Sequence, residues 1–258
     1  MISPHVHIPF SRLSEHLDLI RSKSLNLELY FAGDVLDTII LSDVQKARDL
    51  LDHSPSLSFH APFMDLSPGA VDSLVREATM KRFNHILDVA EVMQPKAIVC
   101  HSGYEKWRYA LKADWWLEMS LLTWRDLNKR AADIGVKLAI ENIFEDEPSN
   151  LKMLMEHMNS DNFGICFDTG HCNLFSKVRL EDWMKALNPH IIELHLHDND
   201  RSSDQHLPVG DGTFAFGKFF HLLKNRDCIH TIEAHSPDKV MRSMENIACF
   251  TGTSAGSS

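Results

Sequence analysis

Short apolar runs alternate with longer amphipathic stretches along nearly the whole chain. Strand-like runs lie at residues 2–8, 25–31, 57–60, 97–101, 136–141, 163–168, 191–195 and 229–233. Between them, apolar positions recur at helical spacing at residues 11–23, 43–52, 70–93, 113–134, 149–158, 180–187, 215–224 and 238–248. Strict alternation of strands and helices predicts a parallel sheet, and eight such units close a barrel. The pattern therefore predicts an α/β fold, a single (β/α)8 TIM barrel.

Length and composition agree with one catalytic domain over residues 1–250. The chain has 258 residues and 44% hydrophobic content, within the range in which α/β barrels occur as single domains. The small-residue segment 251–258, TGTSAGSS, is expected to be a disordered tail. Five cysteines without CxxC spacing favour reduced, buried thiols, and no run reaches the roughly 18 apolar residues of a membrane span. We therefore expect a cytoplasmic protein with no membrane partner.

Side-chain alternation within the later strands separates small or polar residues from large apolar ones. Glu141 shares a face with Ala139, whereas Leu138 and Ile140 occupy the opposite face. The same alternation places further polar residues opposite apolar neighbours: Asp168, His195 and Glu233. In a barrel, inward-facing side chains at the carboxyl ends of the strands converge on one mouth, where the active sites of this fold lie. The sequence thus predicts one site to which several strands contribute side chains.

Nine side chains that end or closely follow these runs are candidate metal ligands. They are His60, His101, Glu141, Asp168, His171, His195, Asp204, His206 and Glu233. Carboxylate oxygens and imidazole nitrogens hold divalent metals, and nine of them suffice for two or three ions. A single histidine at a strand end is more often a hydrogen-bonded structural residue, whereas buried carboxylates are costly to desolvate without a cation. The set as a whole therefore favours a multinuclear metal site.

Other polar residues near the predicted site have more than one interpretation. His197 has the same parity as His195 and competes with it as a ligand; we prefer His195 and assign His197 to substrate binding. Tyr104, Trp107 and Arg108 follow the fourth strand and form either a substrate-binding cluster or a solvated loop. A net charge of -10 argues against polyanion binding over the whole surface, although metal ions would supply positive charge locally. Charge alone therefore leaves nucleic acid open.

Several strings resemble the xylose isomerase-like TIM barrels of AP endonuclease family 2, which include endonuclease IV and many sugar isomerases and epimerases. They are ENIFE, CFDTGH, HLHDND with DQHLPVGDG, and IEAHS. The resemblance implies a first metal held by His60, His101 and Glu141, and a second, bridged by Glu141, held by Asp168, His195 and Glu233. It implies a third metal on His171, Asp204 and His206. Zinc is the metal expected first, and manganese or iron suits the same donors.

The resemblance leaves two reactions open. Where endonuclease IV has an aromatic and basic loop that enters DNA, this chain has the short acidic FAGDVLD, and the stretches PFSRLSEHLDLI and NLELYF are more similar to the sugar branch. By the resemblance, sugar isomerases typically share only Glu141, Asp168, His195 and Glu233, so the five further ligand positions favour hydrolysis of a phosphoester, with damaged DNA as one candidate substrate. The alternative is isomerisation or epimerisation of a small sugar or sugar phosphate. Glu141 and Glu233 are the expected catalytic carboxylates in either case, and an inactive binding module is the least favoured hypothesis.

Overall fold

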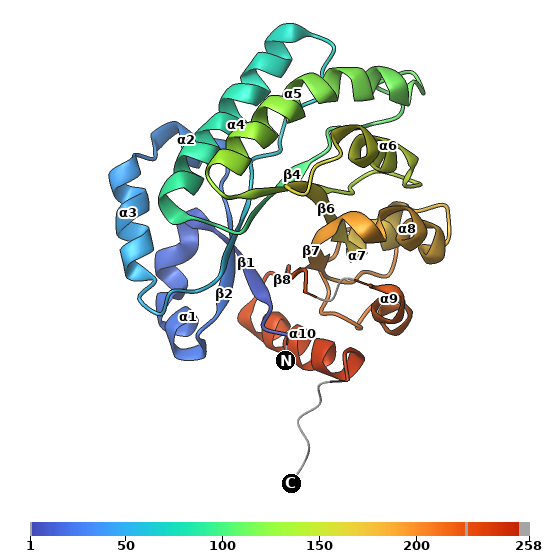
Figure 1. The fold of residues 1–258 in the computed structure, drawn as a ribbon. Helices are drawn as coiled ribbons and strands as arrows, with labels where there is room; N and C mark the ends of the chain where they lie inside the picture. Colours follow the sequence, from blue (N-terminus) through green and yellow to red (C-terminus); the bar gives the residue numbers. More distant parts are fainter. Residues whose placement is uncertain (1, 225–226, 253–258) are drawn as a thin grey trace.

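Eight parallel strands close into a barrel in which each strand pairs with the next along the chain (Figure 1). The computed structural model describes residues 2–224 and 227–252. The strands are β1 (His5–Pro9), β2 (Asn26–Tyr30), β3 (Leu57–His60), β4 (Ala97–His101), β5 (Lys137–Glu141), β6 (Phe163–Asp168), β7 (Ile191–Leu196) and β8 (Ile229–Ile232). β1 also pairs with β8, which completes the closure. The predicted (β/α)8 barrel is confirmed.

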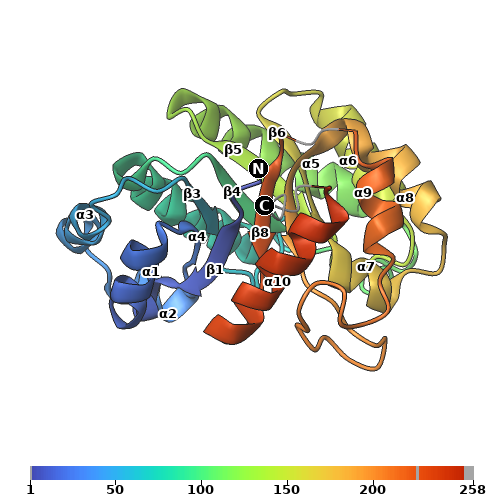
Figure 2. The same ribbon diagram turned by 90° about the horizontal axis from the view of Figure 1, so that it is seen from below.

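Helices surround the barrel on its outer side (Figures 1 and 2). They are α1 (Leu17–Lys23), α2 (Gly33–Thr38), α3 (Leu41–Leu50), α4 (Ser73–Met93), α5 (Ala113–Asp133), α6 (Ser149–Met158), α7 (Thr169–Phe175), α8 (Leu180–Leu187), α9 (Phe216–Leu222) and α10 (Pro237–Phe250), with 3-10 turns η1 (Phe10–His16) and η2 (Asn188–His190). The sequence pattern did not predict α2 and α7, because helices of six and seven residues are shorter than the window that reveals helical periodicity. The predicted helix 11–23 is divided between η1 and α1.

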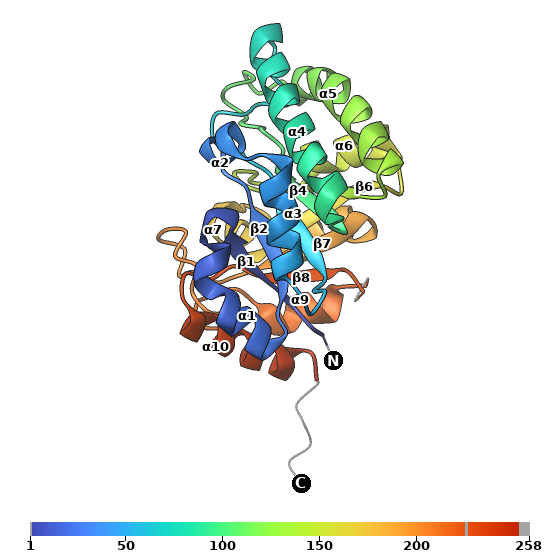
Figure 3. The same ribbon diagram turned by 90° about the vertical axis from the view of Figure 1, so that its left-hand side faces the viewer.

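The space between the strands and the helices holds the main apolar core, which includes Trp116, Trp124, Trp183, Phe59 and Phe167. The first and last helices of the ring, α1 and α10, lie near one another (Figure 3) and flank a cavity lined by residues of both. None of the helices in the described ranges combines the length and apolar composition that a membrane span needs. Four cysteines are buried as expected, whereas Cys249 is exposed, contrary to the expectation of buried thiols.

The interior of the barrel is unusually polar. Its apolar cluster is small and consists of Val99, Ala139 and Cys166, with Ile192 packed against it. Ser58 of β3 donates a hydrogen bond of 2.9 Å to Glu193 of β7, and these strands are not neighbours, so the bond crosses the barrel. Small and polar residues therefore point inward, as the alternation in the sequence predicted.

Of the expected tail, residues 253–258 lie outside the described ranges, and α10 ends at Phe250.

Candidate metal centre at the carboxyl end of the barrel

All nine candidate ligands lie at the carboxyl end of the barrel. His60, His101, Glu141, Asp168 and His195 come from β3 to β7, Glu233 follows β8, His171 lies in α7, and Asp204 and His206 lie in the loop between β7 and α9. Seven of them line a cavity of about 570 Å³, namely His60, His101, Glu141, His171, Asp204, His206 and Glu233. Asp168 and His195 are fully buried beside them. The structure therefore brings the nine side chains into one cluster.

Glu141 lies between four of the histidines. Its Oε2 is 3.2 Å from Nε2 of His60 and 3.2 Å from Nε2 of His101. Its Oε1 is 3.1 Å from Nδ1 of His195 and 3.3 Å from Nδ1 of His171. Burial opposes ionisation of this carboxyl, but the charge of His195 and the hydrogen bonds of His101 and His171 outweigh it and hold the pKa of Glu141 well below its usual range. The two oxygens thus face different pairs of histidines, as a carboxylate shared by two cations would.

Asp168 has a structural task as well as a place in the cluster. It is the N-cap of α7, and its Oδ1 accepts a hydrogen bond of 2.6 Å from the backbone N–H of His171. Asn142, directly after β5, donates to the backbone oxygen of Asp168 at 3.0 Å and accepts from its N–H at 2.9 Å. The sequence DTGH therefore folds as a strand end followed at once by a capped helix, which sets His171 beside Asp168.

His195 and His197 are both fully buried, but they face different groups. Nδ1 of His195 is 3.1 Å from Glu141, 3.4 Å from Glu233 and 3.7 Å from Asp168. Nε2 of His197 is 3.0 Å from Asp168 and 3.7 Å from Glu233, and its ring stacks on His206 at 4.1 Å between centroids. His195 thus contacts all three carboxylates that the family resemblance groups with it, while His197 is a close neighbour of the same cluster.

His206 closes the cluster from the loop after β7. Its Nε2 is 3.3 Å from Glu233 Oε2, and its Nδ1 is 3.6 Å from Asp204 Oδ1. Burial lowers the pKa of His206, but the hydrogen bond and charge of Glu233, together with the charges of Asp204 and Asp168, raise it to about 9. Nε2 of His171 lies 3.5 Å from Asp204 Oδ2, so three donors surround the place where the resemblance puts a third ion.

The donor set fits divalent cations. Ligand atoms within 4.8 Å of one another occur in several groups among the described residues, including three that contain only candidate ligands and His197: His60 with His101 and Glu141; Asp168 with His171 and His197; and His197 with His206 and Glu233. Groups of three nitrogen and oxygen donors at this spacing are what a zinc, manganese or iron ion requires. Two of the groups include His197, which the sequence analysis assigned to substrate binding and which does not line the cavity.

The expected substrate-binding residues separate in the structure. Tyr104 and Arg108 line the cavity, and Arg108 forms an ion pair of 2.6 Å with Glu105. Trp107 is 76% exposed and is not among the lining residues, so the structure does not bring it to the cavity. Aromatic residues that the sequence analysis did not select line it instead, including Tyr30, Phe63 and Phe144. Phe63 stacks on His101 with ring centroids 4.3 Å apart.

Two fully buried carboxyl groups near the cluster were also missed. Glu28 of β2 contacts His7 at 2.7 Å and His195 at 3.0 Å, and Glu193 of β7 accepts hydrogen bonds from Ser58 and Thr231. Burial, together with the charge of Glu28, raises the pKa of Glu193 to about 8. The sequence signal for these two residues was a glutamate in the middle of an otherwise apolar strand, in NLELY and in IIELHL.

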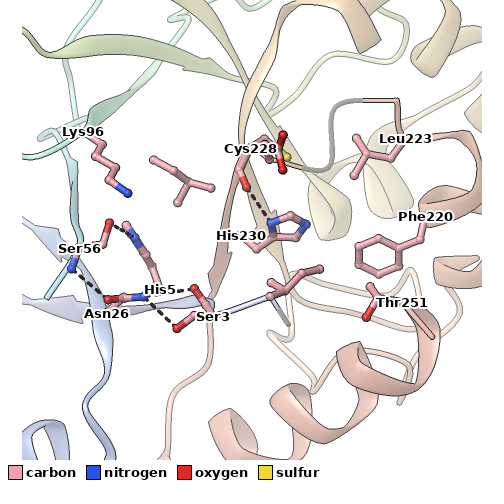
Figure 4. Close-up of a pocket in the computed structure, with 13 residues that line it drawn as sticks. Ser3, His5, Asn26, Ser56, Lys96, Phe220, Leu223, Cys228, His230 and Thr251 are labelled. Carbon is pink, nitrogen blue, oxygen red and sulfur yellow. Dashed lines mark hydrogen bonds between the residues drawn. The ribbon is translucent and has the colours of Figure 1, made fainter. Parts of the chain in front are cut away.

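A second polar cavity, of about 520 Å³, lies at the opposite end of the barrel (Figure 4). His5 and Ser56 form a 3.0 Å hydrogen bond there, and Nδ1 of His230 donates to the backbone oxygen of Cys228 at 2.8 Å. None of the nine candidate ligands lines this cavity. Because active sites of TIM barrels lie at the carboxyl ends of the strands, we assign the candidate site to the first cavity.

Comparisons with known proteins place these observations in a family. The family model described as "Xylose isomerase-like TIM barrel" matches residues 27–248. Protein MJ1311 of Methanocaldococcus jannaschii is 28% identical over 172 residues, which cover 64% of this chain and 59% of that protein. The chain therefore matches less than two thirds of the length of this relative.

Solved structures show the same fold. The TTHB071 protein from Thermus thermophilus, from a crystal soaked with zinc chloride, has a TM-score of 0.81 at 24% identity, covering 98% of this chain and 100% of that chain. A D-tagatose 3-epimerase-like protein has a TM-score of 0.78 at 23% identity, covering 96% and 97%. At these identities the likeness concerns the arrangement of the barrel.

Proposed function

The chain belongs to the xylose isomerase-like TIM barrel family, and on that premise we propose that it is a divalent-metal-dependent isomerase or epimerase of a small sugar or sugar phosphate. This reverses the order of the two hypotheses drawn from the sequence. Sugar 3-epimerases recur among the solved structures that share the fold, including D-psicose 3-epimerase and L-ribulose 3-epimerase. The comparisons lend no comparable support to phosphoester hydrolysis or to a DNA substrate.

The observation that carries the proposal is the pair of carboxylates Glu141 and Glu233. Both line the cavity, and both lie within 3.4 Å of the same nitrogen, Nδ1 of His195. A metal ion held by this set, with Asp168, would polarise the carbonyl and an adjacent hydroxyl of a bound sugar. A carboxylate that contacts the substrate would then accept the proton from the carbon next to the carbonyl. Return of a proton to the neighbouring carbon gives isomerisation, and return to the opposite face of the same carbon gives epimerisation.

The cavity itself suits a small polar substrate. Its volume of about 570 Å³ lies within the usual range for small-molecule sites. Its wall combines aromatic rings, such as Tyr30 and Phe63, with hydrogen-bonding groups. The aromatic rings present flat apolar surfaces to the C–H face of a sugar, and the polar groups match its hydroxyls.

Phosphoester hydrolysis remains the second candidate, favoured by one observation. Asp204 lies 3.5 Å from His171 and 3.6 Å from His206, so the donors of a third ion are together. The acidic segment FAGDVLD gives no support to DNA binding, because it continues into α2 with Asp34 in the first turn and adds no positive charge.

Two activity assays separate these candidates. In the first, metal-loaded protein is incubated in D2O with a panel of ketoses, aldoses and their phosphates, and NMR follows exchange of carbon-bound hydrogen. We expect exchange and interconversion of at least one pair, abolished by a chelator and by Glu233→Gln. The second follows nicking of a duplex with one abasic site and release of phosphate from phosphoesters. Chelator-sensitive hydrolysis without exchange in any sugar would overturn the proposal.

A further inference from the structure

Glu28 contacts the nitrogen of His195 that is opposite to the one facing Glu141 and Asp168, and it also lies within 4.8 Å of Glu233, with His7 as their shared neighbour. It sits in the middle of β2, is 0% exposed, and its Oε2 is 3.0 Å from Nε2 of His195. Its other oxygen, Oε1, is 2.7 Å from Nδ1 of His7 on the neighbouring strand β1. Both oxygens of this carboxylate are therefore occupied by imidazole nitrogens. His195 and Glu28 are 167 positions apart in the sequence, so closure of the barrel alone brings them together.

This contact determines which nitrogen of the His195 ring carries a hydrogen. An ionised carboxylate only accepts hydrogen bonds, so Nε2 of His195 carries the hydrogen that it donates to Glu28. In the neutral ring, the other nitrogen, Nδ1, then presents its lone pair. That nitrogen is 3.1 Å from Glu141 and 3.4 Å from Glu233, in the position where the proposed function requires a metal ligand.

We propose that Glu28 is a positioning residue for the metal centre: by accepting the Nε2 hydrogen of His195, it holds the ring so that Nδ1 faces Glu141, Asp168 and Glu233 as a metal ligand. The inference rests on the proposed function, because it presumes a metal ion at this cluster. Histidines that bind metals commonly donate their second nitrogen to a carboxylate, which fixes the ring and increases its basicity. Loss of such a partner typically lowers metal affinity about 10-fold to 100-fold.

The barrel supplies a matched control in Glu193. Like Glu28, it is a 0% exposed glutamate inside the barrel, and a ligand atom of each lies within 4.8 Å of the other and of His195. The donors to Glu193, however, are Ser58 at 2.9 Å and Thr231 at 2.7 Å. Its position is tied to the floor of the barrel through Ser58, whose Oγ is 2.8 Å from His5. Glu193→Gln therefore controls for the substitution of a buried glutamate in the same layer whose hydrogen bonds run to Ser58 and Thr231.

The test measures metal affinity of the chelator-treated full chain, using Zn²⁺ in competition with a chromophoric chelator. We expect Glu28→Gln to weaken the site that contains His195 by about 10-fold to 100-fold, and Glu193→Gln to change it by less than about 3-fold. Circular dichroism establishes that both variants are folded, and Ser58→Ala controls for loss of a buried hydrogen bond in the same layer. Equal affinity of the wild type and Glu28→Gln, or equal losses in Glu28→Gln and Glu193→Gln, would overturn the inference.

A double-mutant cycle separates positioning from a general effect of charge. If Glu28 acts through the ring of His195, Glu28→Gln should have no further effect on metal affinity in a His195→Ala background. A persistent loss in that background would show that Glu28 acts only as a nearby negative charge, and would overturn the inference. Wild-type protein that takes up no metal would instead contradict the proposed function. The two failures are therefore distinguishable.

Discussion

A β-carbon on Gly170 would lie 2.0 Å from Cε1 of His197. Gly170 is the second residue of α7, within the string DTGH, and His197 follows β7. The absence of a side chain at this point is what allows the His197 ring to pack between α7 and His206. Thr169 fixes the same strand end, because its hydroxyl donates a 2.8 Å hydrogen bond to the backbone oxygen of His197. The turn thus positions a buried histidine beside the metal cluster.

We predict that Gly170→Ala displaces the His197 ring and lowers the free energy of unfolding by about 1–3 kcal/mol, the usual cost of overpacking a buried site. Gly33→Ala is the control, because nothing lies within 4 Å of a β-carbon at that position. Urea unfolding of the metal-free proteins measures both changes. Wild-type stability in Gly170→Ala would show that the ring has room to move aside without cost.

Much of the fold and the cluster could be predicted from the sequence, because both depend on local periodicity. The alternation in strands such as Phe163–Asp168 indicates which face of each strand points inward, and the order of the strands indicates where their carboxyl ends meet. The position of Trp107 could not be predicted in this way, because it lies in an irregular loop, where no periodicity sets the direction of a side chain; its exposure agrees with the alternative of a solvated loop.

The role of Glu28 could not be predicted in the same way. Its partner His195 lies on a strand that is not its neighbour, and their contact depends on how side chains meet across the closed barrel. The order of the two functional hypotheses was also beyond the sequence. The motifs CFDTGH and IEAHS supply candidate metal ligands to the cavity, whereas its aromatic wall, including Tyr30 and Phe63, comes from other parts of the chain.

Loss of Glu141 should affect more than one metal ion. Because its two oxygens face separate pairs of histidines, Glu141→Ala removes a donor shared by two sites. We expect the wild type to carry more than one divalent ion per chain, and Glu141→Ala to lose most of this metal and all activity. His197→Ala should retain most of the metal. Elemental analysis after gel filtration measures the metal content of both variants. Equal loss of metal in the two variants would show that His197, and not His195, is the preferred ligand.

Asp204 distinguishes the two reactions. It contacts His171 and His206 at the proposed third ion, and the pair Glu141 and Glu233 does not depend on it for its contacts with His195. If the enzyme is an isomerase or epimerase, Asp204→Asn should retain sugar turnover within about tenfold. A phosphoester hydrolase would lose roughly 10²-fold or more, because an ion that stabilises the transferring phosphoryl group is removed. Asp200→Asn, an exposed residue of the same loop, is the control for the assay of initial rates.

The last prediction concerns the floor of the barrel, at the end opposite to the metal cluster, and the pH dependence of stability. His5 is 3% exposed, and burial lowers its pKa to about 4 from an ordinary value of 6.5, against the opposing charge of Glu28. Its hydrogen bonds suit the neutral ring. Because the hydroxyl of Ser58 donates to Glu193, its oxygen is left to accept from Nδ1–H of His5, and Nε2 then accepts from Ser56.

The direction of the pH effect follows from these two values. The unfolded chain binds a proton at His5 below roughly pH 6.5, whereas the folded protein binds it only near pH 4, so acid favours unfolding between them. The stabilisation from neutral His5 is complete above pH 6.5 and is lost as the pH falls towards 4. The total loss is on the order of 3 kcal/mol.

His5→Gln cannot take up this proton, and its free energy of unfolding should therefore fall less across the same range. Urea titrations of chelator-treated protein at several pH values measure the difference, with the exposed His157→Gln as control. Parallel pH profiles for His5→Gln and the wild type would contradict the assignment of a neutral, buried His5.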